Sequence, residues 1–357
     1  MSTTEAPTTT SPVLLAGRPV GDGRPPYVIA EAGVNHDGRP DEALRLVDVA
    51  AAAGADAVKF QVFRAESLVA GDAPLAEYQR GQGAATQAEL LRRLELDDAA
   101  LLRVAAHARA AGLHLLATPF GVADVARVVR LSPPALKIAS TDLNNLPLLR
   151  TAVESGLPLL VSTGAATRDE IAAAISRFDA WRVCGRLVLL HCVSCYPAPL
   201  ERANLRAIRA LRRIAGVPCG FSDHTRSPQS GAWAVAAGAC VLEKHFTRDR
   251  SAAGPDHAMS LDPAGLREYV LRAREAHAAL GDGVLGAQDI EADVRAVARR
   301  SVVAARDLPA GAALTADAIT VQRPAGGIAA DRLDELLGRR LAAPVTRGER
   351  ITWEMLA

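Results

Sequence analysis

Short apolar segments alternate with longer amphipathic segments over residues 27–285, and this alternation limits the possible folds more than any other feature. The longer segments, such as 41–54 and 167–178, place Ala, Leu and Arg at helical spacing. The second of them opens with Thr167 and Glu170, which have the spacing of a capping box. The predicted strands are 27–33, 56–63, 113–120, 135–140, 157–164, 186–197, 219–225 and 240–247. Apolar strands separated by helices indicate a parallel sheet covered on both faces.

About eight such units over roughly 250 residues favour a closed (β/α)8 TIM barrel. A doubly wound open sheet is the alternative, but no glycine-rich dinucleotide motif follows the first strand. The pattern changes after residue 286, where short strand-like segments and Gly/Pro turns replace the long units. We therefore expect an α/β chain with a disordered tail at 1–13, a TIM-barrel catalytic domain at 14–285, a linker at 286–300 and a small β-rich domain at 301–357.

Composition excludes several classes of function. The formal net charge of +1 gives no general attraction to nucleic acid or anionic membranes, and no apolar run reaches the roughly 20 residues that span a bilayer. The first residues lack the apolar core of a secretory signal, and the five cysteines form no disulfide framework, so we expect reduced thiols in the cytoplasm. Cys192 and Cys195 have CxxC spacing, but we place both in a strand and find no second pair for zinc.

The chain has only three lysines, Lys59, Lys137 and Lys244, and each lies in a predicted buried strand. A lysine is seldom buried without a partner, and its compact charge is not interchangeable with that of arginine. Because residues two apart share a strand face, Lys244 is expected to point toward the helices and to pair with a carboxylate. Lys59 and Lys137 are predicted to bind an anionic ligand.

Polar residues gather where the predicted strands end, which is where barrel enzymes build their active sites. His224 and His245 end consecutive strands, and two neutral imidazoles suit Mn, Fe, Co, Ni or Zn. The nearby acids Glu31, Glu243 and Asp256 are candidates to complete or support this metal site.

Hydroxyl side chains accompany the two strand-end lysines. Lysines and hydroxyls together are what a phosphate or carboxylate needs, whereas helix capping would explain the hydroxyls but not the lysines. The hydroxyl residues are Thr118, Ser140, Ser162, Ser194 and Ser222.

A series of short motifs runs through the barrel segments: IAEAGVNHDG (29–38), VKFQ (58–61), ATPF (117–120), KIAS…NN (137–145), STG (162–164), HCVSCYPAP (191–199), GFSDHT (220–225), LEKHFT (242–247) and GPDHAMSLDP (254–263). Three more follow in the C-terminal part: SVVAARDLPAGAALT (301–315), QRPAGGI (322–328) and GRRLAAPVTRGERIT (338–352). The first series resembles the sialic acid synthase (NeuB) family, and the second resembles that family's antifreeze-like, or SAF, domain. The match runs in order over nearly the whole chain.

The resemblance implies condensation of phosphoenolpyruvate with an aldose, usually an N-acylated amino sugar such as N-acetylmannosamine, to give a nonulosonic acid and phosphate. It implies a divalent metal, Mn²⁺ first with Mg²⁺ or Co²⁺ as alternatives, held by His224 and His245, with Glu31 near the reacting centre. It also implies a domain-swapped homodimer. The implied phosphoenolpyruvate contacts are Lys59, Thr118, Lys137, Ser140, Ser162, Ser194 and Ser222. The implied acceptor-sugar contacts are Gln61, Asp142, Tyr196, Asp256 and, from the small domain, Arg323.

Two departures from the family pattern leave the acceptor sugar open. Asp142 stands where a longer Glu is common, and the loop 78–87 is short and lacks an expected asparagine. The candidate acceptors are N-acetylmannosamine, its 6-phosphate, mannose and the hexoses that lead to legionaminic, pseudaminic or Kdn-type acids. Rivals from other classes are a metal-dependent hydrolase on the same barrel and a catalytically silent sugar- or ice-binding protein.

Overall fold

The computed structural model describes residues 10–70, 73–75 and 84–357 and divides into two compact units, Met1–Asp282 and Gly283–Ala357. The first unit is a closed barrel in which eight parallel strands pair in the order β10-β3-β4-β5-β6-β7-β8-β9. The TIM barrel is therefore confirmed and the doubly wound sheet is excluded. The barrel strands are β3 (Tyr27–Gly33), β4 (Ala57–Val62), β5 (His114–Pro119), β6 (Leu136–Ile138), β7 (Leu159–Ser162), β8 (Leu187–Cys192), β9 (Cys219–Asp223) and β10 (Val241–His245).

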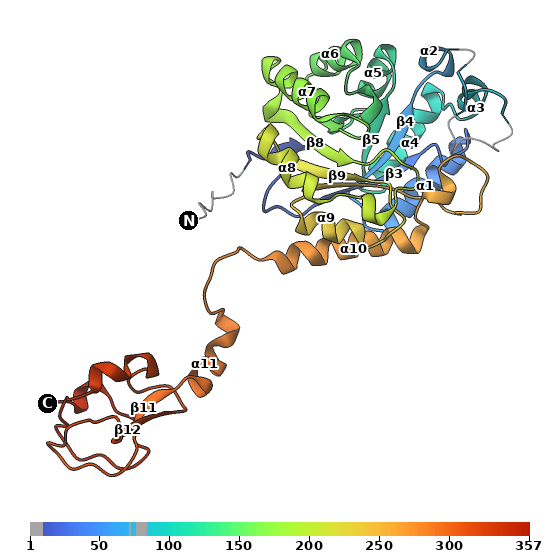
Figure 1. Cartoon of the computed structure of the whole chain (residues 1–357). Helices are drawn as coiled ribbons and strands as arrows, with labels where there is room; N and C mark the ends of the chain where they lie inside the picture. Colours follow the sequence, from blue (N-terminus) through green and yellow to red (C-terminus); the bar gives the residue numbers. More distant parts are fainter. Residues whose placement is uncertain (1–9, 71–72, 76–83) are drawn as a thin grey trace. The chain divides into compact units, whose positions relative to one another are not determined.

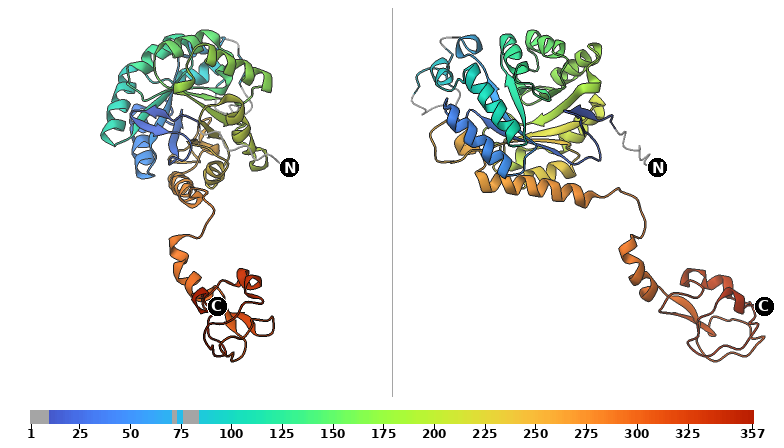
Figure 2. Two further views of the ribbon diagram at one scale, coloured as in Figure 1. Left: turned by 90° about the vertical axis from the view of Figure 1, so that its left-hand side faces the viewer. Right: turned by 180° about the vertical axis from the view of Figure 1, so that it is seen from behind.

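Helices form an outer layer around the strands, as Figures 1 and 2 show. The predicted capping box is present, since the Thr167 side chain accepts from the Glu170 amide and the Glu170 side chain accepts from the Thr167 amide. No helix in the described part of the chain is both long and apolar enough to cross a bilayer. The helices of this unit are α1 (Pro40–Ala52), α2 (Ala65–Leu68), α3 (Gln87–Arg93), α4 (Asp98–Ala110), α5 (Val122–Val129), α6 (Leu146–Glu154), α7 (Arg168–Ala180), α8 (Arg206–Ala215), α9 (Ser230–Ala236) and α10 (Pro263–Leu280).

Alternation along the strands separates the core into two layers. Val28 packs outward among the helices, whereas its neighbours Tyr27 and Ile29 pack inside the barrel. The inner cluster also contains Val13 and Leu15 from the hairpin of β1 (Val13–Leu15) and β2 (Arg18–Val20). This hairpin therefore fills one end of the barrel with apolar side chains.

Two sequence predictions need comment at this point. Of the expected tail, residues 1–9 lie outside the described residues, but the Thr10 amide donates to Asp22 at 2.9 Å and Val13 begins β1. The predicted strand 186–197 was wrong at its end, because β8 stops at Cys192. Cys195 therefore lies beyond the strand rather than within it.

The second unit contains helix α11 (Ala292–Ala298) and the antiparallel strands β11 (Ser301–Ala304) and β12 (Ile319–Gln322). Its own apolar core includes Val302, Leu314, Leu336 and Ile351. Most of the chain between these elements runs as turns and isolated bridges, so the unit is small and rich in irregular β-structure.

Candidate functional site

A cavity of about 860 Å³ opens among the carboxyl ends of the barrel strands. Every site residue that the sequence predicted in the barrel lines this cavity, although Ser194 and Tyr196 reach it from the loop after β8. Arg323 belongs to the second unit, directly after β12. The predicted residues in the lining are Glu31, Lys59, Gln61, Thr118, Lys137, Ser140, Asp142, Ser162, Ser194, Tyr196, Ser222, His224, Glu243, His245 and Asp256.

Lys59 and Lys137 line the cavity together with two carboxylates, Glu31 and Glu243. Lys59 Nζ is 3.3 Å from Glu31 Oε2 and 3.3 Å from Glu243 Oε2. Lys59 also donates to Thr118 Oγ1 at 3.0 Å. Lys137 Nζ lies 3.9 Å from Glu243 Oε1, so Glu243 bridges the two cations. All four charged side chains are at most 6% exposed.

The pKa values in this network separate into two pairs. Burial alone would lower the pKa of Lys59 and raise that of Glu243, but their opposite charges outweigh it, so the Lys59 pKa is raised and the Glu243 pKa is lowered. Burial prevails at the other two groups, raising the pKa of Glu31 to about 7 and lowering that of Lys137 to about 8. Lys59 and Glu243 thus form a stable ion pair, while Glu31 and Lys137 can change protonation near neutral pH.

Serine hydroxyls form the wall beside Lys137. Ser162 Oγ and Ser194 Oγ are buried and lack hydrogen-bond partners among the described residues. A Cβ on Gly164 would come within 2.5 Å of Ser194 Oγ and 2.9 Å of Ser140 Oγ, so only glycine leaves this space open. Hydroxyl donors without partners, next to a lysine, are suited to the oxygens of a bound anion.

His224 and His245 face each other across the same cavity, with ring centroids 5.5 Å apart. His224 Nδ1 donates to the Val193 carbonyl at 2.8 Å, which leaves Nε2 as the atom with a lone pair. His245 Nδ1 is buried without a hydrogen-bond partner, and burial lowers the pKa of its imidazole well below the usual value. At His224, burial alone would lower the pKa, but the nearby Cys192 and the hydrogen bond to Val193 outweigh it and raise the pKa. His245 is thus held neutral, and His224, oriented by a backbone carbonyl, offers Nε2 to a divalent transition metal once it is deprotonated.

The acids proposed to complete or support the metal site differ in whether they lie near the histidine pair. Asp256 Oδ2 is 3.8 Å from His245 Nδ1, whereas Glu243 contacts the lysines and accepts from Ser222 Oγ at 3.0 Å. Among the described residues, no group of three or more His, Cys, Asp or Glu side chains could hold a metal ion. The histidine pair would therefore need oxygen ligands from water or substrate.

Sequence reasoning missed Cys192 as a member of the site. Its Sγ lies 3.7 Å from His224 Nδ1, and the thiol lines the cavity. The CxxC spacing drew attention to this residue together with Cys195, but only the strand register shows that Cys192 lies directly beside Ser222, two residues before His224.

One side of the cavity mouth is apolar. Asp142 lies nearby, and its Oδ1 accepts from Asn145 Nδ2 at 2.9 Å. Part of the loop 78–87 that the sequence analysis singled out, residues 78–83, lies outside the described residues. The apolar lining residues are Val34, Leu68, Val69, Leu91, Leu94 and Phe120.

Comparison with protein families matches the two units separately. The NeuB family matches residues 46–285, and the SAF domain matches residues 299–357. The N,N'-diacetyllegionaminic acid synthase of Legionella pneumophila is 37% identical over 94% of this chain and 96% of its own length. The human N-acetylneuraminate-9-phosphate synthase is 31% identical over 96% of each chain.

Solved structures agree with the sequence comparisons. The N-acetylneuraminic acid synthetase of Leptospira borgpetersenii, crystallised with citrate, is 33% identical and superimposes with a TM-score of 0.72. The similarity covers 81% of this chain and 96% of that one.

Proposed function

The chain belongs to the NeuB family, and from its cavity we propose that it condenses phosphoenolpyruvate with an aldose to give a nonulosonic acid and inorganic phosphate. The observation that carries the proposal is the placement of Lys59 and Lys137, with unpartnered serine hydroxyls, next to the histidine pair in one cavity. A hydrolase would need the histidines and a carboxylate but not this anion-binding wall.

In the proposed reaction, carbon 3 of phosphoenolpyruvate bonds to the aldehyde carbon, water adds at carbon 2, and cleavage of the C–O bond releases phosphate. Lys59 and Lys137 bind the phosphate and carboxylate groups as charge-assisted donors. Glu31, with its pKa raised to about 7 by burial, holds or releases a proton beside the reacting carbons. A divalent metal, with Mn²⁺ expected first and Mg²⁺ or Co²⁺ as alternatives, would be held by His224 and His245. When bound, it supplies a Lewis acid for the aldehyde oxygen.

We propose an unphosphorylated, N-acylated amino sugar as the acceptor, with N-acetylmannosamine as the first candidate. The apolar side of the mouth suits the methyl group of an N-acyl or deoxy substituent, and each buried methylene is worth about 0.8 kcal/mol. The described residues of that side carry no lysine or arginine to pair with a sugar phosphate. A diacetamido sugar that leads to a legionaminic-type acid is the second candidate, favoured by the 37% identity to the Legionella synthase.

The test is turnover of phosphoenolpyruvate with Mn²⁺ and single aldoses, scored by phosphate release and the mass of the keto acid. N-acetylmannosamine, its 6-phosphate, mannose and a diacetamido-trideoxyhexose form the panel. Phosphate release with one sugar, abolished by a chelator, supports the proposal and identifies the acceptor. His224→Ala and His245→Ala should be inactive, and His107→Ala, on the partly exposed face of α4, is the matched control. Full activity in either site variant contradicts the metal assignment, and turnover without phosphoenolpyruvate favours the hydrolase.

We also propose that the active form is a homodimer in which Arg323 of one copy completes the acceptor site of the other. Support comes from apolar side chains at the start of the second unit that are exposed in the single chain, including Leu285 at 100% and Ile290 at 87%. Mixing the inactive variants Arg323→Ala and His245→Ala tests this arrangement. In a swapped heterodimer one cavity keeps both residues, so activity should return; a mixture that stays inactive contradicts it.

A further inference from the structure

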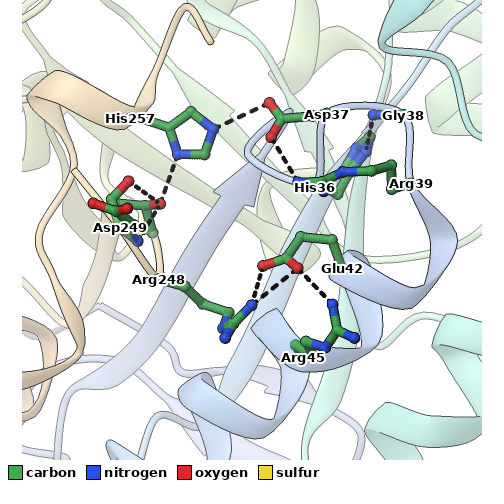
Figure 3. Close-up of polar contacts among 10 residues, drawn as sticks. His36, Asp37, Gly38, Arg39, Glu42, Arg45, Arg248, Asp249 and His257 are labelled. Carbon is green, nitrogen blue, oxygen red and sulfur yellow. Dashed lines mark hydrogen bonds and ion pairs between the residues drawn. The ribbon is translucent and has the colours of Figure 1, made fainter. Parts of the chain in front are cut away.

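A buried histidine outside the cavity, His257, holds the loop that carries Asp256. The loop runs from the end of β10 at His245 to the start of α10 at Pro263. His257 is 3% exposed, and both of its ring nitrogens have partners. Nε2 lies 3.1 Å from Asp37 Oδ1 (Figure 3), and Nδ1 lies 2.7 Å from Thr247 Oγ1.

Chemistry fixes the direction of one of these contacts. A carboxylate can only accept, so Nε2–H donates to Asp37. The Thr247 hydroxyl contacts His257 Nδ1 and also the Asp249 carbonyl, which lies 3.2 Å away. The Asp–His–Thr order resembles the relay of a nucleophilic hydroxyl. However, Thr247 is 1% exposed and is not part of the cavity lining, so it is not placed to attack a substrate.

The contact joins two segments that are far apart in sequence. Asp37 lies in the loop between β3 and α1, and His257 lies in the loop after β10. Gly254 packs against the junction so closely that a Cβ there would come within 2.6 Å of His257 Cδ2 and 2.9 Å of Asp37 Oδ1. No larger side chain at 254 is compatible with this arrangement.

Asp256 depends on this loop for its position. Asp256 is 7% exposed and lines the cavity, and its carboxylate receives no hydrogen bond from the described residues. Only its backbone is tied, since Ser260 Oγ donates to the Asp256 carbonyl at 2.6 Å. Its nearest charged neighbour is His245, whose Nδ1 lies 3.8 Å from Asp256 Oδ2, too far for a hydrogen bond. The side chain next in sequence, His257, is therefore the nearest hydrogen-bonded anchor along the chain.

We propose that His257, held by Asp37 and Thr247, is a positioning residue for Asp256 and so for the acceptor-sugar side of the cavity. The inference rests on the proposed function, in which Asp256 contacts the acceptor. It assigns no role to His257 in binding phosphoenolpyruvate, because the residues proposed for that role lie on β4 to β9 or in the loops that follow these strands.

A second contact between the same segments provides a matched control. Arg248 Nη1 donates to Glu42 Oε1 at 2.7 Å and Oε2 at 3.0 Å, and it also joins the loop after β10 to the start of α1 (Figure 3). Arg248 is half exposed and lies farther from Asp256 along the chain, and Glu42 keeps a second partner in Arg45. Arg248→Ala should therefore leave acceptor binding unchanged.

The experiment compares full-length wild type with His257→Asn, Asp37→Ala, Asp37→Asn and Arg248→Ala. The Michaelis constants for phosphoenolpyruvate and for the aldose that the wild type uses are measured separately. Loss of the buried contact in His257→Asn or Asp37→Ala should raise KM for the aldose about tenfold, with KM for phosphoenolpyruvate within about twofold. Asp37→Asn keeps an oxygen acceptor and should restore most of the loss. The double variant Asp37→Ala/His257→Asn should be no worse than either single variant.

Hydrogen–deuterium exchange of residues 246–262 in the same proteins shows whether the loop is released. Faster exchange with a raised aldose KM supports the inference. Faster exchange with an unchanged aldose KM overturns it, as does an equal rise in both Michaelis constants. A wild type that turns over no aldose refutes the proposed function itself, whereas an active wild type with an unaffected His257→Asn variant refutes only the role of His257.

Discussion

Replacing Lys244 with Met should destabilise the barrel more than any exposed charge substitution. Lys244 Nζ is 3.0 Å from Asp223 Oδ2, and the two side chains are 1% and 0% exposed. Lys244 also donates to the carbonyl and, at 3.2 Å, to the hydroxyl of Thr225. Methionine fills the same space but leaves the Asp223 carboxylate buried without its cation. Removing one partner of a buried pair costs about 3–5 kcal/mol, which is a large part of an ordinary folding free energy of about 5–15 kcal/mol.

The assay is denaturant unfolding followed by far-UV circular dichroism and tryptophan fluorescence. A loss of this size corresponds to a fall in melting temperature of roughly 6–20 °C. The double variant Asp223→Asn/Lys244→Met should recover much of the loss, because a neutral amide no longer needs a cation. Arg272→Met is the exposed control, since its ion pair with Glu275 leaves both side chains about half exposed and screened by solvent, and its loss should change stability little.

Two results would refute this reasoning. A cost below about 1 kcal/mol for Lys244→Met would mean that the buried pair contributes no more than an exposed one. A double variant whose loss equals the sum of the two single losses would mean that Lys244 and Asp223 act independently.

Three further predictions concern the cavity. Gly164→Ala places a Cβ 2.5 Å from Ser194 Oγ and should weaken phosphoenolpyruvate binding at least about tenfold by calorimetry. Gly185→Ala is the control, because a Cβ there meets nothing within 4 Å and binding should be unchanged. Equal phosphoenolpyruvate affinities of the two variants would contradict the proposed anion wall. Glu31 has a pKa raised from 4.5 to about 7, so its stabilising contribution is present below pH 4.5 and lost as the pH rises through 7. In urea unfolding with chelator, Glu31→Gln should therefore be more stable than wild type by roughly 1–3 kcal/mol at pH 8 and no more stable at pH 4.5. The same difference in unfolding free energy between variant and wild type at both pH values would contradict this. His245→Ala should lose Mn²⁺ binding in direct titration of the protein without substrate, and retained affinity would remove it from the metal site.

The pKa shifts in the cavity explain how its buried charges are balanced before an anionic substrate binds. Lys59 and Glu243 satisfy one another, as their opposite pKa shifts indicate. Glu31 and Lys137 are both pushed toward their neutral forms by burial. An anion that arrives beside Lys137 favours its charged form, so binding energy offsets part of the cost of burying that charge.

Much of the fold could be predicted because its signals are local. Three predictions depended only on a few neighbouring residues each, and the structure confirms them. They are the barrel strands from eight apolar segments, the capping box of Thr167 and Glu170 at the start of α7, and the pairing of Lys244 with a carboxylate from side-chain alternation. The hairpin of β1 and β2 was missed because its strands are only three residues long and are held by side chains from distant barrel strands.

The site was predictable as a set of residues but not as a set of contacts. Strand alternation predicted that Glu243 and His245 share a face, yet it could not show that Glu243 lies between two lysines instead of beside a metal. That choice depends on how the barrel closes, where β10 pairs with β3 in the register that sets His245 opposite Glu31. The contact between Asp37 and His257 has the same origin, because closure also brings the loops after β3 and β10 together. Pairings across the closing strands depend on the whole barrel, and no segment of the sequence contains them.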